Sequence, residues 1–210
     1  PRALAPPCGG RYDRPVRPRA PPGGACATAR DVTVSDLPPL NLEPFPPIDL
    51  RHMLTLTDDT AMLQHATCAT PDLWHGYCTD DNARALLAAV KLWALPRDTW
   101  SSPRRAAPSP DKLLTAMHRY LAFLSYALNP AMGRFRNFMQ YDRTWREQVG
   151  SEDSHARTVW ALGETVRRAP TADIRQLAEQ LLQRALPALD KFGHLRPWAY
   201  ALLGLEEYLR

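Results

Sequence analysis

The feature that most constrains the fold of this chain is a polar motif that occurs twice, each time immediately before an apolar run. Thr79–Arg84 reads TDDNAR and Glu152–Arg157 reads EDSHAR, so both contain the pattern Asp-x-x-Ala-Arg. The runs that follow, Ala83–Trp93 and Thr158–Arg167, carry apolar residues at helical spacing. The two motifs therefore predict two equivalent helix starts, with acidic residues in the first turn, where their charge complements the helix dipole.

Amphipathic segments alternate with these apolar runs. Lys112–Leu128 and Ala172–Leu189 place apolar residues on one face, and Trp198–Leu209 reads as a last helix. Only Arg134–Met139 alternates polar and apolar residues, as a short extended ribbon does. A repeated pairing of buried and half-exposed helices is typical of helical arrays. We therefore expect an all-α fold, a partial α/α toroid in which the chain is truncated or a partner completes the ring.

The composition of the chain changes near residue 36. Residues 1–36 are rich in Pro, Gly, Ala and Arg, and we expect a disordered tail or linker there, followed by a helical domain over residues 37–210. The net charge of +4 belongs to the tail, because residues 1–30 contain six arginines against the single Asp13. The helical domain is therefore close to neutral, which argues against a nucleic-acid partner.

The sequence lacks segments that would direct it into or across a membrane. It has no run of about 18 apolar residues, so we expect no membrane span. The N-terminal residues also lack the continuous apolar segment of a signal peptide. We therefore expect a cytoplasmic protein whose four cysteines are free thiols.

Four strings carry a resemblance to a known family. They are LTDDTAMLQHA at residues 56–66, HGYCTDDNARALL at 75–87, YLAFLSYALNPAMGRFRNFMQYDRTW at 120–145 and GSEDSHARTVWALG at 150–163. Together they resemble a bacterial six-hairpin glycosidase-like domain, which is found beside or C-terminal to cell-wall-type glycosyltransferases. The resemblance covers about residues 37–210. It implies a helical toroid that handles an oligosaccharide or polysaccharide, with a glycosyltransferase domain or subunit as a partner.

The acidic residues at the helix starts are the candidate catalytic groups. Cleavage of a glycosidic bond needs a protonated carboxyl group on the leaving oxygen and a second carboxylate as base or nucleophile. Adjacent carboxylates raise one pKa of the pair, which suits a general acid. We expect Asp80 or Asp81 in one role and Glu152 or Asp153 in the other. The alternative is that these residues only cap helices and pair with the arginines of the two motifs.

Further polar and aromatic residues near the motifs are candidates for binding the sugar. Aromatic rings can stack on sugar rings, and polar side chains can form hydrogen bonds with hydroxyl groups. The candidates are Asp58, Asp59, Trp74, His75, Tyr77, Asn82, Arg84, Arg136, Asn137, Tyr141, His155 and Arg157. A structural role is the alternative for several of them, namely helix capping for Asp58 and Asp59 and an internal hydrogen bond for His155.

A zinc site is a competing interpretation of one stretch. His65-x-x-Cys68 and His75-x-x-Cys78 supply four ligands of the kinds that tetrahedral zinc takes. The gap between the two pairs is short for a zinc finger, so we expect no metal.

Motifs for other enzyme classes are missing from the sequence. It has no glycine-rich phosphate loop, no GxSxG motif and no nucleotide-binding fingerprint. We therefore expect no cofactor, and no kinase, esterase or intact glycosyltransferase in these residues. The alternative to a glycoside hydrolase is a non-catalytic domain that binds a carbohydrate or serves as a scaffold for a glycosyltransferase.

Overall fold

A computed structural model describes residues 49–96 and 109–210, all within one of the chain's two units, Phe45–Arg210. The tail predicted over residues 1–36 lies outside the described residues. The helices are α1 (Arg51–Thr55), α2 (Thr79–Ala94), α3 (Pro110–Ala127), α4 (Glu152–Arg168), α5 (Ala172–Ala185), the 3-10 helix η3 (Leu186–Lys191) and α6 (Leu195–Leu209). The strands are β1 (Leu63–Thr67), β2 (Thr70–Cys78), β3 (Leu128–Asn129), β4 (Arg134–Phe135) and β5 (Phe138–Met139).

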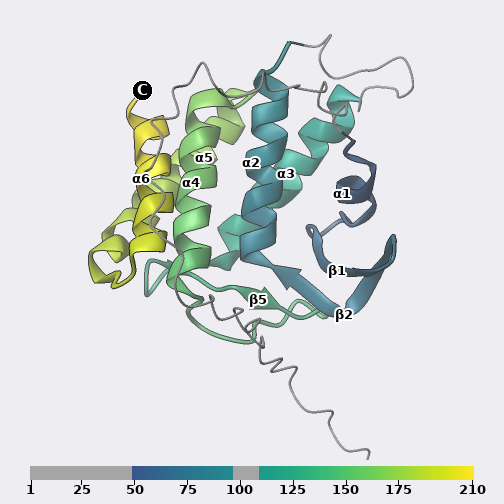
Figure 1. Ribbon diagram of the computed structural model, residues 1–210, viewed down its shortest axis with the longest axis horizontal. Helices are drawn as coiled ribbons and strands as arrows, with labels where there is room; N and C mark the ends of the chain where they lie inside the picture. The colour runs from purple at the N-terminus through teal and green to yellow at the C-terminus, as the bar shows by residue number, and fades with distance from the viewer. Residues whose placement is uncertain (1–48, 97–108) are drawn as a thin grey trace, which may run out of the picture. The chain divides into compact units, whose positions relative to one another are not determined.

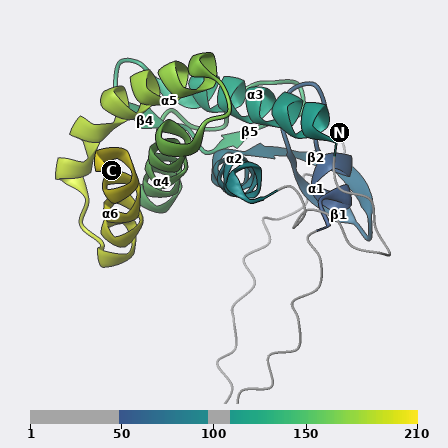
Figure 2. The ribbon, with the colours of Figure 1, turned by 90° about the horizontal axis from the view of Figure 1, so that it is seen from above.

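The long helices form two layers (Figures 1 and 2). In one layer α4 lies between α2 and α6, and in the other α3 packs on α2 and α5 packs on α4. The helices α2, α4 and α6 all begin at the end of this unit where β2 and β5 lie (Figure 1). Their first turns therefore come together, which is the arrangement that positions the candidate site.

The prediction of an all-α partial toroid is wrong. The described residues include two antiparallel sheets, with strand orders β1-β2-β5 and β3-β4, and their helices form layers rather than a ring. The β1–β2 hairpin is hidden in the sequence because β2 is buried only over its last three residues and lacks regular alternation. The ribbon predicted at Arg134–Met139 divides between the sheets, since β4 pairs with β3 and β5 pairs with β2.

The strand β2 runs directly into α2. The hydroxyl group of Thr79, the first residue of α2, donates a hydrogen bond to the carbonyl oxygen of Arg136 at 2.7 Å. Gly76 has a φ of +66°, and a Cβ atom there would lie 2.2 Å from the carbonyl oxygen of Met139. Only glycine combines a positive φ with the absence of a Cβ atom. Gly76 therefore allows β5 to pair with β2 close to the start of α2.

Backbone contact and an ion pair to a buried carboxylate fix α4 between its neighbours. A Cβ atom added to Gly163 on α4 would lie 2.0 Å from the carbonyl oxygen of Gly204 on α6. At the far end of the helices, the fully buried Glu164 on α4 pairs with Lys91 of α2 at 3.0 Å. The relation between the first turns of α2, α4 and α6 is therefore set by packing along their whole length.

Candidate functional site

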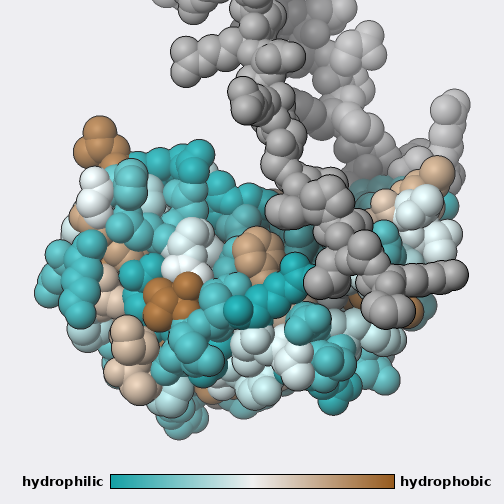
Figure 3. Space-filling view, turned by 90° about the horizontal axis from the view of Figure 1, so that it is seen from below, coloured by the Kyte–Doolittle hydropathy of each residue, from teal (hydrophilic) through white to brown (hydrophobic). Residues whose placement is uncertain are grey.

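The surface at the start of α2, α4 and α6 is polar. Viewed from this end, the described residues show mostly hydrophilic side chains with small separate apolar patches (Figure 3). The side chains that matter for function are those that the three helices bring together there.

Ion pairs join the starts of α2 and α4. Asp80 on α2 accepts two hydrogen bonds from Nη1 of Arg157 on α4, at 2.8 and 2.7 Å. Arg84, one turn further along α2, contacts Asp80 at 2.7 Å and Asp81 at 3.1 Å. The arginines of the two repeated motifs therefore hold the carboxylates of the first motif, and the sequence-predicted residues of both motifs meet in one network.

The pKa values of both carboxyl groups on α2 are raised. For Asp80 burial is the largest cause, Arg157 opposes it, and the charge of Asp153 adds to the rise. For Asp81 burial is again the largest cause and the charge of Asp80 comes next. Both groups therefore hold a proton more readily than an ordinary aspartate does, and the acidic residues of the two motifs act on each other electrostatically.

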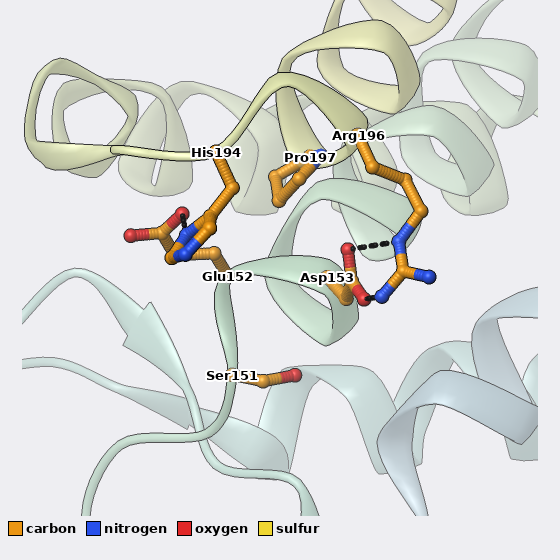
Figure 4. Close-up of a pocket in the computed structure, with 6 residues that line it drawn as sticks. All are labelled: Ser151, Glu152, Asp153, His194, Arg196 and Pro197. Carbon is orange, nitrogen blue, oxygen red and sulfur yellow. Dashed lines mark hydrogen bonds and ion pairs between the residues drawn. The ribbon is translucent and has the colours of Figure 1, made fainter.

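The start of α4 faces the start of α6 across a pocket of about 460 Å³ (Figure 4). Glu152 accepts hydrogen bonds from the backbone N–H of Gly193 at 3.2 Å and from Nδ1 of His194 at 2.9 Å. Asp153 accepts a hydrogen bond from Nε of Arg196 at 3.0 Å. The bond from His194 is the main cause of the lowered pKa of Glu152. Glu152 is therefore held in its ionised form by the residues just before α6, and Asp153 is paired with Arg196 of α6.

A second pocket, of about 290 Å³, lies further along the same three helices. It is lined by Arg84 and Leu87 of α2, Arg157 and Trp160 of α4, and Tyr200 of α6. Nη2 of Arg157 donates a hydrogen bond to the hydroxyl oxygen of Tyr200 at 3.2 Å, and its guanidinium carbon lies 4.8 Å from the centre of that ring. This pocket therefore combines charged and aromatic side chains.

Three of the predicted binding residues are internal. Asn82 is fully buried and bonds to the backbone of Met62, while Asn137 accepts hydrogen bonds from the side chains of Cys78 and Ser154. His155 is also fully buried. Such bonds lock the β2–α2 junction and the start of α4 in place, so these residues position the site rather than contact a ligand.

The environment of His155 fixes its protonation state. Its Nδ1 accepts a hydrogen bond from the backbone N–H of Phe135 at 3.3 Å, and its Nε2 donates one to the carbonyl oxygen of Ala185 at 3.1 Å. Burial, followed by the charge of Arg134, lowers the pKa of His155 to about 4. The structural alternative stated for this residue is therefore the one that the contacts support.

The acidic pair Asp58–Asp59 lies outside the network. Asp58 accepts a hydrogen bond from the hydroxyl group of Tyr77 at 2.6 Å and one from the backbone N–H of Thr60 at 2.7 Å. Burial and this bond raise the pKa of Tyr77 above its ordinary range. Asp59 pairs with Arg119 of α3 at 2.8 Å. These residues shape a turn before β1 instead of capping a helix.

The remaining candidates are spread over the sheets and loops. Trp74 is 85% exposed on β2, and His75 lies 3.7 Å from Asp72 on the same strand. Tyr141 stacks on the ring of Tyr77, and the guanidinium group of Arg136 lies over Trp145. Within the described residues, the contacts of these four candidates, Trp74, His75, Tyr141 and Arg136, do not reach the acidic network.

The zinc interpretation finds no support in the geometry. Within residues 49–96 and 109–210 no three His, Cys, Asp or Glu side chains form a group that could hold a metal ion. Cys78 is buried and donates a hydrogen bond to Asn137, and burial raises the pKa of its thiol to about 12, whereas Cys68 is exposed.

The residues that the start of α6 brings to the site were missed in the sequence. They are His194, Arg196 and Tyr200. The resemblance between WAYALLG and the apolar run of α4 was the available signal. It was weak because α6 has no acidic residue in its first turn and supplies cationic and aromatic partners instead.

Comparison with family models, curated proteins and solved structures gave no match. None of the helices in the described part of the chain is both long and apolar enough to cross a membrane.

Proposed function

We propose that the network at the start of α2, α4 and α6 binds a carbohydrate. The observation that carries this proposal is the row of carboxylate–guanidinium contacts that joins Asp80 to Arg157 and Asp153 to Arg196. Ionised carboxylates only accept hydrogen bonds and guanidinium groups only donate them. A carboxylate and a guanidinium group held side by side can therefore bind adjacent hydroxyl groups of a sugar, since each hydroxyl group both donates and accepts hydrogen bonds.

Two further features support a carbohydrate ligand. The network opens into two pockets. The larger is lined mainly by charged and polar side chains, and the smaller adds the apolar and aromatic side chains of Leu87, Trp160 and Tyr200, so together they offer the mixture that small-ligand sites use. The motifs that supply Asp80, Arg84, Asp153 and Arg157 are also those that resemble the glycosidase-like family.

Glycoside hydrolysis is the reaction that this cluster supports best. The pKa values of Asp80 and Asp81 are raised, whereas that of Glu152 is lowered. Carboxyl groups with opposite shifts suit a general acid and its ionised partner. We assign the acid to Asp80 or Asp81 and the ionised carboxylate to Glu152 or Asp153.

A non-catalytic role beside a glycosyltransferase is the second candidate, and one observation favours it. Each of the four carboxylates already has a protein partner, namely Arg84 or Arg157 on α2 and α4, and His194 or Arg196 at the start of α6. Using a carboxylate in chemistry would require breaking one of these pairs, which costs free energy when the pair is partly buried. In this case the network would hold an oligosaccharide for a glycosyltransferase domain or subunit.

A screen of oligosaccharides for binding and turnover separates the two candidates. If the domain is a hydrolase, the parent protein cleaves at least one compound, and Asp80→Asn and Asp153→Asn each lower the rate about 100-fold or more. Asp59→Asn is the matched control, because its carboxylate lies outside the network. Binding without turnover in the parent would leave the non-catalytic role, and no binding of any compound would remove the carbohydrate proposal.

A further inference from the structure

We infer that the smaller pocket between α2, α4 and α6 is a subsite for one uncharged sugar ring, with Trp160 as its stacking surface. This inference rests on the proposed carbohydrate function and adds the class of sugar and a residue that the repeated motifs do not include. At about 290 Å³ the pocket is at the small end of the range for ligand sites, which suits a single ring.

The aromatic wall of the pocket is built by two helices. Trp160 on α4 and Tyr200 on α6 stack with ring planes 12° apart and centres 5.9 Å apart. Both rings are partly exposed, and so is Leu87, which lines the pocket from α2. The apolar face of a sugar ring packs on such a surface, while its hydroxyl groups point toward the polar edge of the pocket.

The guanidinium groups at the polar edge of the pocket already have carboxyl partners. Arg84 and Arg157 are both bound to Asp80, and Arg84 also contacts Asp81. An anionic sugar would have to displace Asp80 from Arg157, and each of these side chains is only 17% exposed. Separating a largely buried carboxylate from one of its two partners is costly. An uncharged sugar instead uses the remaining hydrogen-bonding positions and leaves the ion pairs intact.

The position of the pocket indicates that it takes the second ring of an oligosaccharide. Asp153 and Arg196 line the larger pocket, and Arg157 and Tyr200, four residues further along α4 and α6, line the smaller one. Four residues of helix advance roughly 6 Å. The two pockets therefore follow one another along the same helices, and a bound disaccharide would fill both.

Isothermal titration calorimetry on the full chain tests this inference. The probes are gluco- and manno-oligosaccharides of one to three residues and oligogalacturonides of the same lengths. We expect a neutral disaccharide to bind at least tenfold more tightly than its monosaccharide and than the digalacturonide. Trp160→Leu should remove the gain from the second ring and leave the monosaccharide affinity within about twofold.

Two more variants keep the test decisive. Trp93→Leu, a partly buried tryptophan at the other end of α2, is the matched control and should keep the full gain. If Trp160→Leu lowers the helical circular dichroism signal, the variant is not properly folded and Leu87→Asn replaces it in the test. Leu87→Asn changes a different wall of the same pocket and should also reduce the gain in affinity from the second ring. The inference is overturned if folded Trp160→Leu and Leu87→Asn proteins both keep the gain, or if the digalacturonide binds best, although carbohydrate binding itself then stands. If no probe binds the parent protein, the proposed function fails and the subsite with it.

Discussion

Asp80 and Arg157 come from different copies of the repeated motif and bind each other, with both carboxylate oxygens of Asp80 within 2.8 Å of the same guanidinium nitrogen. The two side chains are each 17% exposed, so water solvates this ion pair only weakly. The contact ties the start of α2 to the start of α4 and sets the charge balance of the network. Arg157 also lines the smaller pocket, so both stability and ligand binding should depend on this contact.

Breaking this pair should destabilise the fold. Arg157→Met leaves the carboxylate of Asp80 with Arg84 alone, and we expect the free energy of unfolding to fall by about 2–4 kcal/mol. Urea denaturation followed by circular dichroism measures the change. Arg119→Met breaks the exposed pair with Asp59 and should cost about 1 kcal/mol or less. Equal losses of unfolding free energy in the two variants would show that the Asp80–Arg157 pair contributes no more to stability than the exposed Asp59–Arg119 pair.

The close approach of α4 and α6 predicts a strong effect of one methyl group. A Cβ atom at Gly163 meets backbone atoms of Gly204, which cannot move without shifting α6. Gly163→Ala should therefore lower the free energy of unfolding by about 1–3 kcal/mol, as overpacking of a core does. Gly193→Ala is the control, because no atom lies within 4 Å of the added carbon there, and a neutral result is expected. A neutral result at Gly163 would contradict the packing described for α4 and α6.

The buried His155 predicts a pH dependence of stability. Its pKa is lowered from 6.5 to about 4 in the folded protein, so the unfolded chain takes up the proton first as the pH falls. The contribution of His155 is complete above pH 6.5 and is lost as the pH falls toward 4, with a slope of up to about 1.4 kcal/mol per pH unit. Urea denaturation at pH 7 and pH 5 measures how far the free energy of unfolding falls between the two pH values. This fall should be smaller for His155→Gln than for the parent. The same substitution at the exposed His52 should leave the parent's difference unchanged.

The two described cysteines should differ in reactivity. Cys68 is exposed, whereas Cys78 is buried with its pKa raised to about 12, and the thiolate is the reactive form. Iodoacetamide at pH 8 followed by peptide mass spectrometry should find Cys68 modified within minutes and Cys78 unmodified until urea is added. Rapid labelling of Cys78 in the native protein would mean that the β2–α2 junction opens readily.

Local patterns in the sequence predicted the helices well. The two motifs form the first turns of α2 and α4, as predicted, and the amphipathic segments became α3 and α5. These features depend on the spacing of apolar residues and on acidic residues in a first turn, which are properties of neighbouring residues. Pairing of the acidic residues with the arginines of the two motifs was the alternative stated from the sequence, but it did not specify that Asp80 would bind Arg157 of the other motif.

Features that depend on distant residues were not predictable in this way. The pairing of β2 with β5 joins residues far apart in the chain, such as Tyr77 and Met139, and no periodicity records it. The β1–β2 hairpin is local, and it was missed because most of β2 is not buried. The contribution of α6 was missed for a related reason, since Arg196 and Tyr200 matter only because α6 packs against α4. The three internal polar residues Asn82, Asn137 and His155 looked like ligand-binding groups because burial is not visible in a short motif.

The affinity of a neutral oligosaccharide for the parent protein and for Asp80→Asn tests the central claim most directly. Calorimetry with the tightest compound from the screen should give measurable binding to the parent and at least tenfold weaker binding to Asp80→Asn, because the substitution removes one side of the network. Asp59→Asn should bind like the parent. Binding that is equal in all three proteins, or no binding to the parent by any compound, would contradict a carbohydrate site at the start of α2, α4 and α6.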